Sequence, residues 1–80
     1  MYYAYILKST TYGTHYYGSS KDVQERLNQY NSGKVRYTNG RRPWTLIYSE
    51  VFDTRSEAVQ RERFFKSSDG HNWLKSEGII

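Results

Sequence analysis

The sequence predicts the α+β fold class: a small three-stranded antiparallel sheet packed with helices, in the order β-β-α-β-α-α. Short aromatic and branched segments are typical of strands, and apolar stripes with helical spacing follow capping signals. The chain has 80 residues, which allow one domain over residues 1–80. Its 9 Tyr, 3 Phe and 2 Trp supply the apolar area that so small a core needs.

Three segments are predicted to be strands. Residues 2–8 carry aromatic or branched side chains on both alternating faces, which is typical of a strand covered on both sides. A polar stretch with Gly13 follows, and residues 15–17 form a second short strand that ends at Gly18. The short connection favours an antiparallel hairpin between these two strands. The third strand is predicted over residues 44–52.

Three helices complete the predicted order. Residues 19–22 open the first, with a Ser cap and an acid in the first turn, and Gly33 lies just past its end. Residues 54–57 form a capping box that begins a second helix, which continues to about Lys66. Residues 67–70 are expected to break it, and a last short helix over 71–80 is expected to close the core.

Composition restricts the classes of function. Lys and Arg number 12 against 8 Asp and Glu, and the sequence pI is about 9.4, so a positive field favours polyanionic partners. No apolar run approaches the roughly 20 residues that a membrane span needs, and no secretory signal is visible, so we expect a cytoplasmic protein with no membrane partner. The absence of cysteine excludes disulfides and thiolate sites, and the two histidines lack zinc-ligand spacing.

Glu62 is the most informative single position. On a helical wheel it lies between Ala58 and Phe65, within the stripe that should face the sheet. Burying a lone carboxylate costs several kcal/mol unless something pairs with it. Two interpretations follow: a cation, either a metal or an Arg, lies beside it, or Glu62 forms a structural salt bridge at the edge of the stripe.

Arg26 and the tyrosine pair at 16 and 17 are also open to two interpretations. Arg26 lies four residues after Asp22, which allows a surface ion pair, but its guanidinium could equally grip a phosphate. Tyr16 and Tyr17 precede Gly18 and point to opposite faces. Both phenols could be core, or one could stand at the sheet edge beside a helix N-terminus that attracts anions.

A basic loop follows the first helix. Its cations are interleaved with Tyr37, a pattern that suits phosphate contacts and base stacking, although a solvated charged loop has the same composition. These candidate nucleic-acid-binding residues are Lys34, Arg36, Arg41 and Arg42.

Taken together, these positions resemble the GIY-YIG nuclease family, in particular its small stand-alone members. The first triplet of the family would be Tyr3-Ala4-Tyr5 and the second Tyr16-Tyr17-Gly18, with Arg26 on the next helix and Glu62 on a later one. The resemblance runs from about Tyr3 to Leu74. Gly and Ile of the first triplet are replaced by Tyr3 and Ala4, Ile of the second by Tyr17, and a common helical His by Tyr30.

The resemblance implies a GIY-YIG-like fold and hydrolysis of a DNA phosphodiester, as in DNA repair, with one divalent ion, Mg²⁺ or Mn²⁺. In that scheme Glu62 ligates the metal, Tyr16 activates or positions water, and Arg26 neutralises phosphoryl charge. Tyr5 and Tyr30 support them, whereas Asn72 is a further candidate that cannot be aligned. All five side chains are then expected on one face, and a Glu62 across the sheet from Arg26 would argue against a nuclease.

Two other function classes stay open. A nucleic-acid-binding module could keep the scaffold without cutting DNA, and a partner-binding domain could share the layout by chance. A chain this short could also depend on a partner protein for its substrate specificity. Metal-dependent turnover, or its absence alongside salt-dependent binding, separates these classes.

Overall fold

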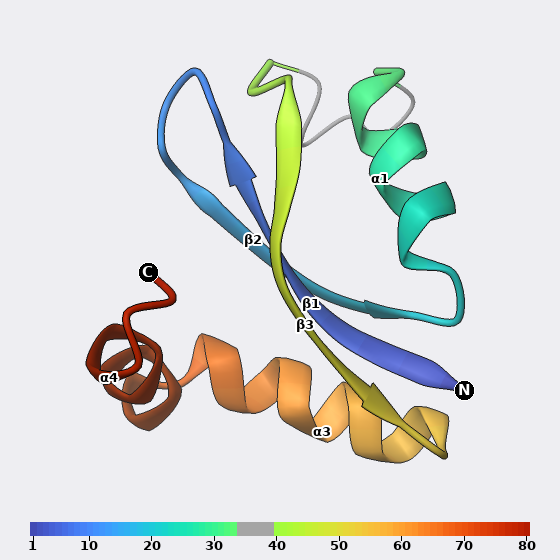
Figure 1. Ribbon diagram of the computed structural model, residues 1–80, viewed down its shortest axis with the longest axis vertical. Coiled ribbons are helices and arrows are strands. Elements are labelled where there is room, and N and C mark those ends of the chain that lie inside the picture. The colour runs from blue at the N-terminus through green and yellow to red at the C-terminus, as the bar shows by residue number, and fades with distance from the viewer. Residues whose placement is uncertain (34–39) are drawn as a thin grey trace.

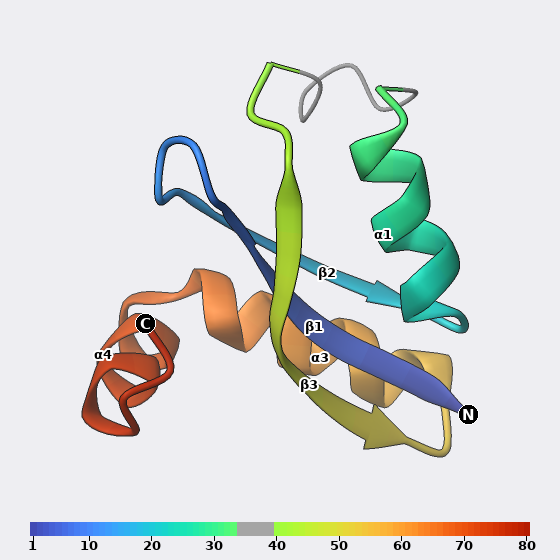
Figure 2. The same ribbon diagram turned by 45° about the horizontal axis from the view of Figure 1, so that its top comes forward.

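The three strands form one antiparallel sheet in a computed structural model that describes residues 1–33 and 40–80. The central strand, β1, pairs with β2 on one side and with β3 on the other, so that β2 and β3 are the two edges (Figures 1 and 2). This confirms the α+β class and the element order. The elements are β1 Tyr2–Ser9, β2 His15–Ser20, α1 Val23–Asn31, β3 Trp44–Phe52, α3 Arg55–Lys66 and α4 Ser68–Ser76.

Helices cover both faces of the sheet. The alternation of β1 sends Tyr5 and Leu7 towards α1, where they meet Tyr30. It sends Ala4 and Ile6 towards α3 and α4 on the other face. All four β1 side chains are at most 1% exposed, which confirms that this strand is covered on both sides. The arrangement leaves α1 and α3 on opposite faces (Figure 1).

The strand β2 is longer than the sequence suggested, and α1 begins later. Ser19 and Ser20 remain paired with β1, opposite Ala4 and Tyr3, instead of opening the helix. Asp22 is the N-cap, because its carboxylate accepts a hydrogen bond from the backbone N–H of Glu25 at 3.0 Å. The expected Ser cap is therefore wrong, since pairing across the sheet retains both serines.

The predicted break at residues 67–70 is also shorter than expected. Ser67 accepts a hydrogen bond from Gly70 N–H and caps α4, which ends at Ser76. The corner is tight: a Cβ added at Gly70 would lie 2.5 Å from the carbonyl carbon of Phe64. Glycine therefore serves here as a close-contact residue inside a helix, whereas the sequence pattern had suggested a helix breaker.

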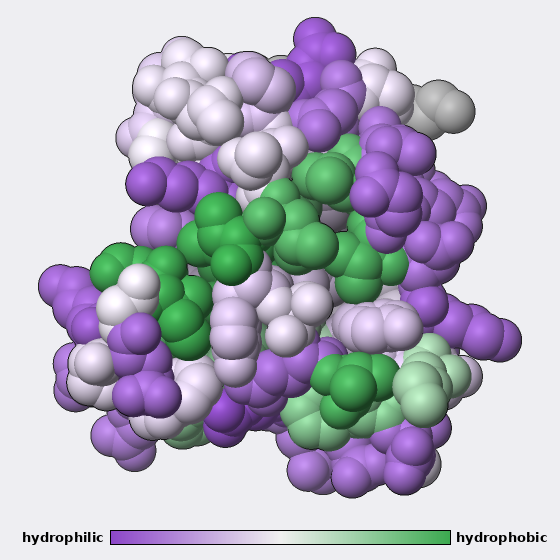
Figure 3. Space-filling view, viewed as in Figure 1, coloured by the Kyte–Doolittle hydropathy of each residue, from purple (hydrophilic) through white to green (hydrophobic). Residues whose placement is uncertain are grey.

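The second edge strand, β3, leaves apolar side chains uncovered. Leu46, Ile47 and Val51 are between 37% and 52% exposed, and hydrophobic surface crosses the middle of the molecule in Figure 3, where β3 runs.

Among the described residues, no helix has the length and apolar character that crossing a membrane requires.

Candidate active site

A connected array of phenols and one arginine lies on the α1 side of the sheet. The hydroxyl of Tyr5 is 2.9 Å from that of Tyr30, and both side chains are at most 1% exposed. Arg26 donates from Nη2 to the same Tyr30 oxygen at 2.9 Å and from Nη1 to Gln29 at 2.7 Å. Because Gln29 and Tyr30 hold the guanidinium, the surface ion pair with Asp22 that the sequence allowed does not form. Asp22 is instead engaged as the helix cap.

Gly18 makes room for this array. It lies directly opposite Tyr5 in the β1–β2 register and is itself buried. A Cβ at Gly18 would lie 2.5 Å from Cζ of Tyr5 and closer still to its hydroxyl oxygen. The glycine of the second triplet is thus required because the Tyr5 ring crosses the strand at that point.

Tyr16 borders the array, while Tyr17 points to the other face. The Tyr16 ring packs against Tyr30 with centroids 5.0 Å apart, whereas Tyr17 belongs to the cluster beneath α3. Burial first, and then hydrogen bonding with Tyr30, raises the pKa of Tyr16 to about 12, although Lys66 and Arg26 act in the opposite direction. The phenol is therefore neutral near pH 7.

Glu62 comes from α3 and is paired on both oxygens. Ser19 Oγ donates to Oε1 at 2.7 Å, and Lys66 Nζ approaches Oε2 at 2.7 Å. The Glu62 side chain is 20% exposed, so it lies at the edge of the buried stripe, with a lysine as its cation. The sequence left two interpretations of Glu62 open. The structure matches the second, in which Glu62 forms a salt bridge at the edge of the buried stripe.

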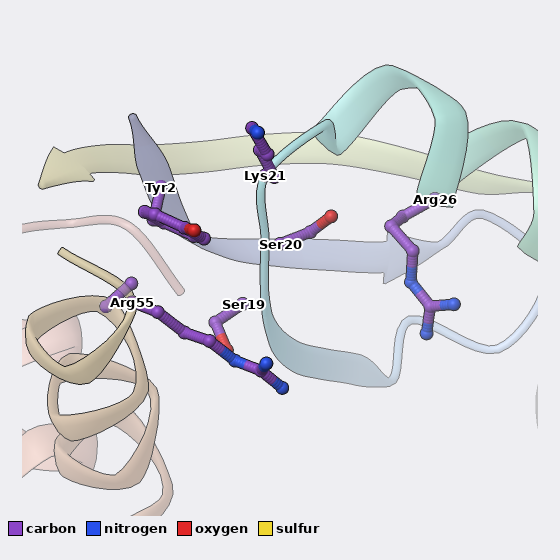
Figure 4. Close-up of a pocket in the computed structure, with 7 residues that line it drawn as sticks. Tyr2, Ser19, Ser20, Lys21, Arg26 and Arg55 are labelled. Atoms are coloured by element: carbon purple, nitrogen blue, oxygen red, sulfur yellow. The ribbon is translucent and has the colours of Figure 1, made fainter. Parts of the chain in front are cut away.

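The five candidate side chains do not share one face of the sheet, contrary to expectation. Tyr5, Tyr16, Tyr30 and Arg26 lie on the α1 side, whereas the helix of Glu62 covers the other side. This is the placement that was expected to argue against a nuclease. What offsets it is that the two groups meet around the edge strand β2. Ser19, which holds the Glu62 carboxylate, lines the same surface hollow as Arg26 (Figure 4). The strand at this edge has no neighbour beyond it in the described sheet, so α1 and α3 side chains can both reach past it.

The basic loop is only partly described. Lys34 and Arg36 lie outside the described residues. The Arg42 guanidinium donates to the carbonyl oxygen of Asn31 at 3.2 Å, near the end of α1, and Arg41 borders a hollow with Tyr12 beside the β1–β2 turn. Arg41 and Arg42 therefore do not line the hollow beside Arg26.

Sequence reasoning missed three supporting residues. Gln29 lies three positions after Arg26, and Lys66 lies four positions after Glu62. Side chains at these spacings meet on a helix, so both contacts could have been predicted from the sequence. Ser19 had been assigned to a helix cap. Only the sheet register reveals that it shares the face of Tyr17 and reaches Glu62.

Comparison with known proteins identifies the lineage. A model of the GIY-YIG catalytic domain matches residues 1–75. The chain belongs to the GIY-YIG family. A UPF0213 protein of Staphylococcus saprophyticus is 43% identical over 79 residues, covering 95% of each chain. One from Halobacterium salinarum is 43% identical over 63 residues, or 78% of this chain and 80% of that protein.

A solved GIY-YIG relative has a similar fold. The solution structure of a UPF0213 protein from Bacillus halodurans aligns with a TM-score of 0.54 and 35% identity, covering 95% of this chain and 84% of that one. The resemblance to a small stand-alone member is therefore confirmed. The GIY-YIG family is of nuclease type, but the names of these relatives state no reaction.

GIY-YIG nucleases generally depend on a divalent metal. The residues beside β2 fit a site in which the protein supplies a single carboxylate. No group of three or more His, Cys, Asp or Glu side chains gathers anywhere in the described ranges. Glu62 supplies one carboxylate, which accepts a hydrogen bond from Ser19, a residue that lines the hollow. Mg²⁺ is commonly held by one or two carboxylates together with waters and substrate phosphate, so a single Glu suits it, whereas zinc would need more protein ligands.

Proposed function

We propose that this chain is a metal-dependent endonuclease that hydrolyses a DNA phosphodiester in DNA repair or processing. In this proposal residues 1–80 act as one catalytic domain in the cytoplasm, where DNA would be accessible. The carrying observation is that Arg26, fixed by Tyr30 and Gln29, lines a hollow at the edge of β2 together with Ser19, whose hydroxyl holds the carboxylate of Glu62. Membership of a nuclease-type family supports the same conclusion.

Arg26 is the group assigned to the phosphate. Its guanidinium is already oriented by two side-chain hydrogen bonds and lies 5.0 Å from the Tyr30 ring centre. A prearranged cation loses little freedom when charge builds up on the phosphoryl oxygens, so it stabilises the transition state efficiently. Tyr5 contributes by fixing the Tyr30 hydroxyl, which makes both phenols positioning residues.

Glu62 is the group assigned to the divalent ion, Mg²⁺ or Mn²⁺. Its Oε1 is held by Ser19, and its other oxygen is shared only with Lys66, whose side chain is 52% exposed. An exposed ammonium leaves a carboxylate at little cost, because surface ion pairs contribute at most about 1 kcal/mol. The chemistry supplied by a bound ion would be polarisation of the phosphate and stabilisation of the leaving oxygen.

Tyr16 is assigned to the attacking water, as a positioning group. With a pKa of about 12, its phenol keeps its proton near neutral pH. A neutral phenol can hold a water molecule by hydrogen bonding, but it is a poor base at that pH. Of the two roles that the family resemblance implied, orientation of the water is therefore the one proposed.

The test measures turnover and binding separately. Glu62→Gln and Arg26→Ala should each abolish or greatly reduce turnover in Mg²⁺ on nicked, branched or plain duplexes. DNA binding in Ca²⁺ should change far less, because interactions made only in the transition state affect the rate. Glu25→Gln and Arg63→Ala, which change exposed charges on α1 and α3, are the matched controls. Turnover by Glu62→Gln equal to that of the parent would refute the metal-ligand role.

A binding module without cleavage is the second candidate. The specific observation in its favour is that Lys66 already neutralises Glu62. This candidate predicts steep salt dependence of DNA binding with no turnover on any substrate. For either candidate, a partner protein could supply specificity for the DNA. For the nuclease, turnover that depends on added cell extract would favour such a partner.

A further inference from the structure

A hollow of about 410 Å³ lies at the end of β2, between the start of α1 and the start of α3. Three of its lining residues are cations, namely Lys21, Arg26 and Arg55, and none of the seven is acidic. Figure 4 shows the side chains of Arg55 and Arg26, which come from different helices, with the β2 residues Ser19 and Ser20 between them; all four line the hollow. Neither Lys21 nor Arg55 has a role in the proposed reaction.

Arg55 and Lys21 differ from the other cations around the site because nothing in the described chain holds them. Arg26 is bonded to Gln29 and Tyr30, and Lys66 to Glu62. Within the described ranges, neither Arg55 nor Lys21 forms a hydrogen bond or an ion pair. Their charges are therefore available to a ligand.

The position of Arg55 is unfavourable for its own helix. It is the first residue of α3, where the helix dipole carries its positive end and a cation is unfavourable. Helix stability therefore does not explain an arginine there. The same positive end adds to the field of Arg55, as the start of α1 adds to that of Lys21, and both favour an anion in the hollow.

Glu62 bonds Ser19, which lines the hollow, but Lys66 already pairs with that carboxylate. Two further acids near the hollow are held at helix ends. Asp22 caps α1 through the backbone of Glu25, and Glu57 completes the capping box with Thr54. Both carboxylates are thus committed to helix ends. The hollow consequently combines three cations, no lining acid and the aromatic side chain of Tyr2.

We infer that this hollow binds the backbone phosphate that adjoins the cleaved one on the same DNA strand, with Arg55 as its main ligand and Lys21 as a second cation. The inference rests on the proposed function for the nature of the strand. Arg26 belongs to the tyrosine array and lines the hollow together with Arg55, so a strand with one phosphate at Arg26 would continue along the hollow towards Arg55. The planar fork of arginine suits two-point contact with a phosphate.

The experiment compares Arg55→Ala with Arg63→Ala, which removes the same charge from an exposed position of α3 outside the hollow. Binding of a short duplex in Ca²⁺ is measured from low to moderate salt. We expect Arg55→Ala to weaken binding about tenfold and to reduce the slope of log K against log salt by about 0.9. Arg63→Ala should leave both close to the parent. Arg55→Lys should restore the slope but only part of the affinity.

Melting temperature separates a binding role from a structural one. Removing a cation from the start of a helix should leave the stability of Arg55→Ala equal or slightly higher. Equal salt slopes for Arg55→Ala and the parent, or a parent that binds no DNA, would overturn the inference. Loss of slope in Arg55→Ala with no turnover by the parent would uphold a DNA phosphate site at Arg55 while refuting the nuclease and, with it, a cleaved neighbouring phosphate. If the parent turns over DNA but its salt slope equals that of Arg55→Ala, the inference fails and the nuclease proposal stands.

Discussion

Replacing Gly18 with Ala tests how the tyrosine array is built. The new methyl carbon would lie 2.5 Å from Cζ of Tyr5, well inside van der Waals contact. The Tyr5 side chain is 1% exposed and hydrogen bonded to Tyr30, so its ring has little space in which to move aside. Either the ring shifts and lengthens the bond to Tyr30, or β2 moves away from β1.

The expected loss is about 1–3 kcal/mol, which is the usual cost of adding a methyl group to a filled core. Loss of the buried hydrogen bond between the two phenols would bring the value towards the upper end. For a chain of this size, each kcal/mol lowers the melting temperature by about 4–8 °C. Gly18→Ala should therefore melt at least about 4 °C below the parent.

Thermal and urea unfolding measure this loss, and Gly40→Ala is the control because nothing lies within 4 Å of a Cβ added there. The Arg26 side-chain NH resonances should also shift in Gly18→Ala, since Tyr30 links Arg26 to Tyr5. Equal melting temperatures for Gly18→Ala and Gly40→Ala would show that Tyr5 does not need the glycine, and the reasoning would fail.

Two further predictions concern stability away from the array. Arg61→Ala should cost about 1–3 kcal/mol, because Arg61 bonds Glu50 at 2.8 Å and lies 4.6 Å from the ring centres of Phe64 and Trp73. Its salt slope for DNA binding should match that of the parent, and a reduced slope would contradict a purely structural role. Alkaline pH should destabilise the fold, because burial first, followed by hydrogen bonding, raises the pKa of Tyr16 and of Tyr48 from 10.0 to about 12. Both phenols lose protons first in the unfolded chain, so the free energy of unfolding should be unaffected by them below pH 10 and should fall between pH 10 and 12. A curve that is equally steep for the parent and for Tyr16→Phe with Tyr48→Phe would contradict this assignment.

The sequence by itself determined the elements that depend on local spacing. The capping box joins Thr54 and Glu57, which are three positions apart, and its hydrogen bonds form within the first turn of α3. The alternation of residues 2–8 likewise fixes which side chains share a face. Interactions of this kind need only the neighbouring chain, so the residue pattern carries them.

Only the tertiary structure decided how the site is assembled. Ser19 and Glu62 are 43 positions apart and meet because α3 docks beside the edge of β2. No local pattern distinguishes Arg55, whose side chain has no partner among the described residues, from Arg61, which Glu50 and the aromatic rings hold. Which helix covers which face depends on how apolar stripes pack across the whole sheet. For that reason the sequence could propose candidate residues for the site, but not that they approach it from both sides of one strand.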